Sequence, residues 1–167
     1  KSGFRLAYRN IRYQGTGCVV QPEAAITLLE DLPFKIIETY LQPFFPADRS
    51  RFNRDWISQQ ESHALGMVHN GSLTGIGVIR RCRKGWKIGP LLADNHEIAE
   101  QLFLTLSSKA DPSDPVYLDI PEVNPAAVAL AQQNHLTPVF DTARMYTANP
   151  PDLPTDRLYG VTSFEIG

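Results

Sequence analysis

The stretch that decides the fold reads Val116-Tyr-Leu-Asp-Ile-Pro-Glu-Val-Asn, then Pro125-Ala-Ala-Val-Ala-Leu-Ala-Gln-Gln-Asn-His, then Leu136-Thr-Pro-Val-Phe-Asp-Thr-Ala-Arg-Met-Tyr. Its first residues are β-branched and aromatic, which is typical of a buried strand. Pro121 predicts that this strand ends or bends there, because proline has no N–H to give to a neighbouring strand.

The middle of the stretch predicts a helix, and its end predicts a returning strand from Val139 to Tyr146. Asn124 offers a side-chain acceptor at the N-cap, and the fixed φ of Pro125 suits the first helical position. The apolar residues that follow are three and four apart and form one stripe. A strand broken by proline, a helix and a returning strand together predict an opening in a sheet, where ligands of such folds often bind.

Length and composition indicate a globular chain of one ordinary domain. The chain has 167 residues and a formal net charge of -2, which gives no reason to expect nucleic acid or an acidic membrane as a partner. Cys18 and Cys82 are isolated, so neither a disulfide framework nor a metal site is indicated, and a reducing cytoplasm is favoured. No apolar run reaches the roughly 18 residues of a membrane span.

The remaining segments complete an α+β pattern. We expect an extended segment from Phe4 to Tyr13 near the start of the chain. We also expect a final strand from Tyr159 to Ile166. Between them the pattern predicts a short strand, two helices, a three-strand meander and a third helix: Cys18–Val20, Pro33–Gln42, Arg49–Gln59, Ala64–His69, Leu73–Arg83, Trp86–Leu92 and Ile98–Leu106. This order predicts a mixed, mostly antiparallel twisted sheet with helices on both faces.

Several short motifs resemble the GNAT N-acetyltransferase family. Asn124-x-x-Ala127-x-x-Leu130 resembles a family segment, and more specific matches resemble the C-terminal domain of bacterial tandem-GNAT proteins. These matches are Gly77-Val-Ile-Arg-x-Cys, Trp86-Lys-Ile-Gly-Pro-Leu, Leu118-Asp-x-Pro-Glu-x-Asn, Thr142-Ala-Arg-Met-Tyr-Thr and Gly160-Val-Thr-Ser-Phe-Glu. The resemblance implies the GNAT (acyl-CoA N-acyltransferase) fold for residues 18–167. It also implies that residues 1–17 are a remnant of the last strands of a preceding GNAT domain, so we expect the chain to be a piece of a longer protein.

The resemblance further implies acetyl-CoA as the donor and an amine, on a small molecule or a peptide, as the acceptor. The pantetheine arm would lie between the splayed strands Trp86–Leu92 and Val116–Ile120, and the pyrophosphate at the helix start after Asp94. The residues expected to contact the cofactor are Ile88, Gly89, Leu91, Leu92, Asn95, His96 and Asn124.

Three side chains are candidates for the chemistry of acetyl transfer. Glu122 and Asp119 flank the expected opening, where a carboxylate could accept the amine proton directly or through water. The alternative is that either carboxylate forms a structural ion pair with Arg144. Tyr146, or Tyr117, could donate a proton to the departing thiolate, although tyrosines in strands more often serve packing.

Three departures from the family pattern lead to a second hypothesis. The segment from Ala93 to Ile98 lacks the glycines of the family's pyrophosphate loop, and Asp94 and Glu97 have the spacing of a capping box. Ala131 stands where the family often has a tyrosine. The chain would then be a catalytically silent partner that completes a neighbouring substrate cleft or mediates homodimer formation through the sheet edge and the Phe4–Tyr13 segment.

Overall fold

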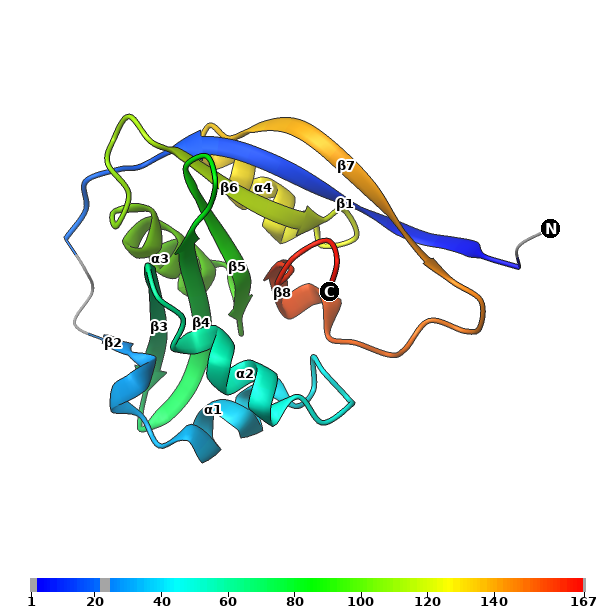
Figure 1. The fold of residues 1–167 in the computed structure, drawn as a ribbon, viewed down its shortest axis with the longest axis horizontal. Coiled ribbons are helices and arrows are strands. Elements are labelled where there is room, and N and C mark those ends of the chain that lie inside the picture. The colour runs from blue at the N-terminus through cyan, green and yellow to red at the C-terminus, as the bar shows by residue number, and fades with distance from the viewer. Residues whose placement is uncertain (1–2, 22–24, 167) are drawn as a thin grey trace.

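A computed structural model describes residues 3–21 and 25–166 (Figure 1). Its helices are α1 (Phe34–Leu41), α2 (Ser50–Ile57), α3 (His96–Ser107) and α4 (Pro125–Gln133). Its strands are β1 (Arg5–Thr16), β2 (Ile26–Leu28), β3 (Ser62–His69), β4 (Ser72–Arg81), β5 (Trp86–Ala93), β6 (Pro115–Pro121), β7 (Thr137–Tyr146) and β8 (Leu158–Gly160).

The strands form one mixed, mostly antiparallel sheet, as the sequence predicts. Its order is β2-β3-β4-β5-β6-β1-β7, with β8 paired to β5 off this path. Only the β5–β6 contact is parallel among the described pairs. The β3–β4 hairpin turns at Asn70-Gly71, where both residues have positive φ of 50° and 76°, the conformation that this dipeptide favours.

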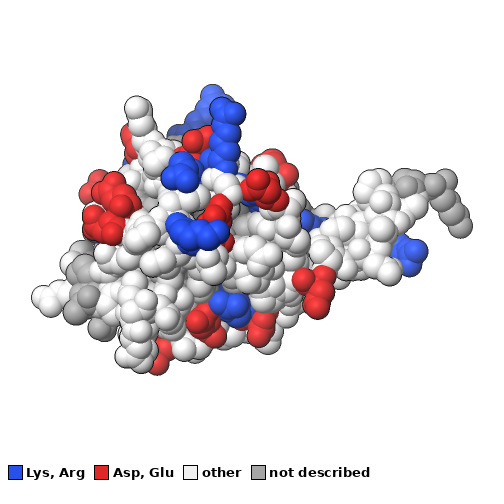
Figure 2. Space-filling view, turned by 90° about the horizontal axis from the view of Figure 1, so that it is seen from below, with Lys and Arg blue, Asp and Glu red and all other residues white. Residues whose placement is uncertain are grey.

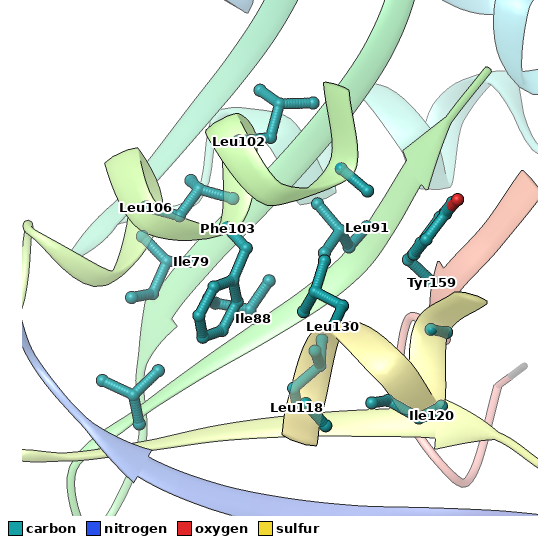
Figure 3. Packing of buried hydrophobic residues seen from close by; sticks show 14 of the residues in the cluster. Ile79, Ile88, Leu91, Leu102, Phe103, Leu106, Leu118, Ile120, Leu130 and Tyr159 are labelled. Carbon is teal, nitrogen blue, oxygen red and sulfur yellow. The ribbon is translucent and has the colours of Figure 1, made fainter. Parts of the chain in front are cut away.

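Helices cover both faces of the sheet, which also confirms the predicted layout. α3 and α4 pack on one face, where the side chains of Ile88, Leu118 and Leu130 share a single apolar core (Figure 3). α1 and α2 pack on the other face over β3 and β4, where Ile37 and Ile76 belong to a second core. The two cores account for why the strands of the meander are apolar on both sides.

The N-terminal strand has a position that the sequence did not indicate. β1 lies between β6 and β7 and pairs with both, so residues 5–16 belong to the same sheet as the rest of the chain. β6 pairs with β1 only from Asn10 onward, whereas β7 continues to Arg5. β1 and β7 therefore project from the body as a two-stranded ribbon, whose outer end carries few charged atoms in Figure 2.

Two predicted strands differ from the structure. Cys18–Val20 is not a strand, because the chain passes closely over the turn before β6: the Gly17 N–H donates to the Asp114 carbonyl, 3.1 Å, and a Cβ on Gly17 would lie 2.3 Å from the Asp111 carbonyl. The final strand expected from Tyr159 to Ile166 is only β8. After Gly160 the chain leaves β5, because the Val161 N–H donates to a carbonyl of β6 instead.

Candidate functional site

β5 and β6 part along the sheet, as expected. They pair at three positions only, ending at Ile88 opposite Leu118, and beyond that point the two strands are not bonded to each other. Pro90 and Pro121 lie in the parted portions, where a missing N–H does not interrupt a ladder. The parting of these strands is therefore confirmed.

The gap between the parted strands is filled by the chain's own C-terminal residues, Leu158–Ser163, which we call the gap segment. Gly160 pairs with Leu91 and Leu158 with Leu92 on the β5 side. On the β6 side, the Val161 N–H donates to the Asp119 carbonyl, 2.9 Å. The gap segment thus bridges the two strands as an extended chain.

The gap segment fits tightly. Gly89 has no room for a Cβ, which would lie 2.6 Å from the carbonyls of both Val161 and Thr162. A Cβ on Gly160 would lie 2.5 Å from Leu118 Cδ1. Tyr159 is 2% exposed and joins the core beneath α3 and α4 (Figure 3). The segment is therefore part of the packed interior.

Asn124 holds both a helix and the gap segment. Its Oδ1 accepts from the N–H groups of Ala126, 3.1 Å, and Ala127, 3.3 Å, which confirms its predicted role as N-cap of α4. Its Nδ2 donates to the carbonyls of Asp156, 3.2 Å, and Leu158, 3.0 Å. The side chain expected to contact the cofactor is thus occupied by the chain itself.

The other residues that were expected to contact acetyl-CoA lie around the same gap, but their side chains are already hydrogen-bonded or buried. Ile88, Leu91 and Leu92 are fully buried in the two cores. The Asn95 side chain caps α3 by accepting from the Ile98 N–H, 3.0 Å, so the predicted capping box of Asp94 and Glu97 is wrong: Asn95 is the N-cap, and Ile98 at the third helical position cannot complete a box. His96 Nε2 lies 2.9 Å from the side-chain oxygen of Gln133.

Asp94 instead ties the loop before α3 to the start of the gap segment. Its Oδ1 accepts from the Tyr40 hydroxyl, 3.0 Å, and pairs with Arg157. The Arg157 guanidinium lies over the rings of Tyr40 and Phe44, 5.3 and 5.2 Å from their centroids. Burial is the main cause that raises the pKa of Tyr40, so its hydroxyl stays a donor at ordinary pH.

Asp119 is a structural anion in this fold. It is fully buried and binds Arg12 through two bonds, 2.7 and 2.9 Å, and Lys87 at 2.5 Å. Burial lowers the pKa of Lys87, although the neighbouring carboxylate acts in the opposite direction. The Phe164 ring covers both cations, at 4.5 Å from Arg12 and 5.3 Å from Lys87. A structural ion pair of Asp119 was one of the predicted alternatives, but the partners are Arg12 and Lys87 and not Arg144.

Glu122, Tyr146 and Tyr117 do not belong to the buried ion cluster of Asp119, and each lies in a different place relative to the gap. Glu122 is exposed just beyond β6, and its Oε1 accepts from the Arg9 N–H, 2.8 Å. Tyr146 pairs with Arg5, five residues from the point where β6 meets β1, about 17 Å along the strand. Tyr117 lies opposite Lys87, in the paired portion before the gap. Of the candidates Asp119, Glu122 and Tyr146, only Glu122 is an exposed side chain beside the gap, and one of its oxygens is bonded to the Arg9 N–H.

Sequence reasoning missed two features of this site, the gap segment and the Arg12–Lys87–Asp119 cluster. The available signal for the cluster was a lysine within an otherwise apolar strand, flanked by Trp86 and Ile88. Of the helices formed by the described residues, none is long and apolar enough to cross a membrane. Residues 3–21 and 25–166 likewise contain no group of three or more His, Cys, Asp or Glu side chains placed to hold a metal ion.

Comparison with known proteins identifies the fold family. A family profile described as an acetyltransferase (GNAT) domain matches residues 37–160. The chain belongs to the GNAT acetyltransferase domain family. GNAT acetyltransferases use acyl-CoA donors, and in this chain the strands that part in the GNAT fold are β5 and β6.

The individual relatives are longer than this chain. Holothin acyltransferase of Pseudoalteromonas sp. is 24% identical over 119 residues, which are 71% of this chain and 40% of that protein. A putative acetyltransferase of Pyrococcus horikoshii has the same fold, with a TM-score of 0.80 and 23% identity over 98% of this chain and 53% of that one. A putative GNAT acetyltransferase of Novosphingobium aromaticivorans matches with a TM-score of 0.59 and 15% identity over 86% of this chain and 65% of that one. The chain thus spans between 40 and 65% of the length of these relatives.

Proposed function

We propose that this chain is the non-catalytic GNAT domain of an N-acetyltransferase. The whole protein would transfer an acetyl group from acetyl-CoA to an amine, and this domain would complete the acceptor cleft of a neighbouring GNAT domain. The observation that carries the proposal is the gap segment, which occupies the parting between β5 and β6. Family membership supports acyl transfer as the reaction of the whole protein.

The energetic argument rests on what a donor would have to displace. A pantetheine arm between β5 and β6 would need the backbone edges that Gly160 and Val161 now occupy. Removing the gap segment would also expose Tyr159, whose burial contributes about 2 kcal/mol. Since 1.4 kcal/mol is a factor of ten in affinity, this loss alone would weaken donor binding more than tenfold.

The projecting ribbon supports a partner domain. Phe4, Leu6 and Met145 are 54, 56 and 43% exposed near its outer end, an apolar surface of the kind that marks interfaces. The chain spans only 40 to 53% of two relatives, which leaves room in such proteins for a second domain. In this proposal residues 1–17 continue from that preceding domain, in a cytoplasmic protein.

A second candidate function is that this domain itself acetylates an amine. It is favoured by the parted strands and by exposed Glu122 at the end of the gap, which could act as the base once the gap segment has moved away. Asp119 would not serve, because it is bound to two cations. Tyr146 has no place in this candidate, since it lies far along the ribbon.

Calorimetric titration of the chain with acetyl-CoA separates the two candidates. We expect no binding at millimolar ligand, and unchanged protection of the Val161 amide in hydrogen exchange. Micromolar binding together with loss of that protection would overturn the silent assignment. Glu122→Gln is then the informative variant, because glutamine keeps an oxygen for the Arg9 N–H but cannot accept a proton; unchanged turnover would remove Glu122 as base.

A further inference from the structure

A cavity of about 220 Å³ lies next to the gap segment, between the ribbon and the α1–α2 connection. Its wall is mostly apolar and is built from four separate parts of the chain. Its larger apolar side chains include Phe44, Phe45, Leu153, Leu158, Val161 and Ile166. Segments distant in sequence thus converge on one hollow, which is the usual construction of a small-molecule site.

Two arginines, Arg49 and Arg144, line this otherwise apolar cavity. Within the described part of the chain, neither forms a salt bridge with a carboxylate. Other arginines of the protein do so, and these pairs are Arg9–Asp141, Arg12–Asp119, Arg81–Asp114 and Arg157–Asp94. The cavity therefore concentrates positive charge without an anion from residues 3–21 or 25–166.

Both guanidinium groups are held in place by neutral contacts. Arg49 lies over the rings of Phe45 and Phe52, at 4.3 and 4.4 Å from their centroids, and burial lowers its pKa. Arg144 Nε donates to the Tyr146 hydroxyl, 3.0 Å. Both are half-buried, so an anion that reached them would be partly shielded from water. Guanidinium groups held in this way are suited to planar, two-point binding of a carboxylate.

We infer that this cavity binds a small amphipathic carboxylate, with its apolar body against the phenylalanine and aliphatic walls and its carboxylate on Arg49 and Arg144. The cavity is smaller than the sites of drug-sized ligands, so the ligand is about as large as octanoate. This inference does not rest on the acetyltransferase proposal. Because Leu158 and Val161 belong to both the cavity wall and the gap segment, the ligand would also stabilise the filled gap.

Three eight-carbon probes test the charge requirement on the intact chain. Octanoate, octanol and octylamine share an apolar body and differ only in their polar end. Hydrogen bonds between two charged groups are roughly twice as strong as those between neutral groups, so we expect octanoate to bind at least about tenfold more tightly than octanol in calorimetric titration. Octylamine is expected to bind more weakly than octanol. Equal binding of octanoate and octanol, or no binding of octanoate at about 5 mM, would overturn the inference.

Substitutions then locate the binding site. Arg49→Gln and Arg144→Gln should each weaken octanoate binding about tenfold and leave octanol binding unchanged. Arg51→Gln is the matched control, because Arg51 is an exposed residue of α2 that does not line the cavity. Arg49→Lys keeps the charge and should lose less affinity than Arg49→Gln, and thermal unfolding of each variant reports whether the fold persists. An equal loss in Arg51→Gln would show that octanoate binds elsewhere.

Discussion

In the part of the sheet formed by β1, β5 and β6, the two faces of the sheet carry different kinds of side chains. On the face covered by α3 and α4, Ile88 and Leu118 are buried among other apolar side chains. Their neighbours in sequence, Lys87 and Asp119, point to the opposite face and meet Arg12 there as a buried ion cluster. The first face gains stability from burial. The second face has to offset the cost of desolvating three charges.

Unpaired polar atoms also occur on this second face. Thr162 is 2% exposed and lies against side chains of α1 and α2, and its hydroxyl has no hydrogen-bond partner among the described residues. The Asn10 side-chain oxygen, two residues along β1 from Arg12, is likewise without a partner in the described part of the chain. The gap segment contributes to both faces, because its Tyr159 belongs to the core beneath α3 and α4 while its Thr162 lies on this face. The comparison therefore teaches that the alternation of these strands separates an apolar core on one face from an ion cluster and unpaired polar atoms on the other.

The largest expected effect comes from breaking the ion cluster. Asp119→Ala leaves Lys87 and Arg12 without their anion, and removing one partner of a buried pair costs about 3–5 kcal/mol. Urea unfolding measures this loss. Asp119→Asn is the control for volume, and it should also be destabilising because the two cations remain uncompensated. A loss below about 1 kcal/mol in both variants would mean that water reaches the cluster.

The matched residue on the apolar face should give a smaller loss of a different kind. Leu118→Ala removes a fully buried side chain beneath α4 and is expected to cost about 3 kcal/mol. Because no charge is involved, this loss should be the same at low and high salt, whereas the loss in Asp119→Ala should vary with pH. Unfolding at two salt concentrations and two pH values checks both statements; a salt-dependent loss in Leu118→Ala would contradict the separation of the two faces.

Lys87 makes the charged face dependent on pH. Burial lowers its pKa in the folded chain below the ordinary value of 10.5, so the unfolded chain binds more protons than the folded one between these two values. The contribution of Lys87 to stability therefore rises with pH through this window and is lost as pH falls through the lowered pKa. We expect the difference in unfolding free energy between wild type and Lys87→Met to increase with pH across this window. Taking the difference removes the contributions of tyrosines, which act in the opposite direction. A constant difference would show that the pKa of Lys87 is not lowered.

Local patterns predicted most of the elements but not their long-range partners. The helix after Asn124 and the parting of the strands near Pro121 follow from properties of neighbouring residues, and both are present. The position of β1 between β6 and β7 depends on pairing across more than one hundred residues, which no local pattern encodes. For the same reason the run after Leu158 was identifiable as extended chain, but its place inside the gap was not.

The candidate site was predictable only in outline. The residues around the gap were identified, yet Asp119 pairs with Arg12, 107 positions away in sequence, and not with the nearer Arg144. Alternation in β1 places Arg12 on one face, but only the register against β6 brings it opposite Asp119. Partner choice of this kind requires the sheet order, which the sequence did not indicate.

The smallest expected effect tests the gap segment directly. Thr162→Val replaces a buried hydroxyl that has no partner among the described residues by a methyl group of similar volume, and should raise the free energy of unfolding by about 1 kcal/mol or less. The same change should slow hydrogen exchange of the Val161 amide, because it stabilises the filled gap specifically. Ser108→Ala, at the half-buried end of α3 where the hydroxyl is already bonded to the Thr105 carbonyl, is the control and should not slow that exchange. If Thr162→Val instead destabilised the chain, the Thr162 hydroxyl of the wild type would have to form a hydrogen bond in solution. That bond would then hold the gap segment in place together with the burial of Tyr159 and the hydrogen bonds of Asn124.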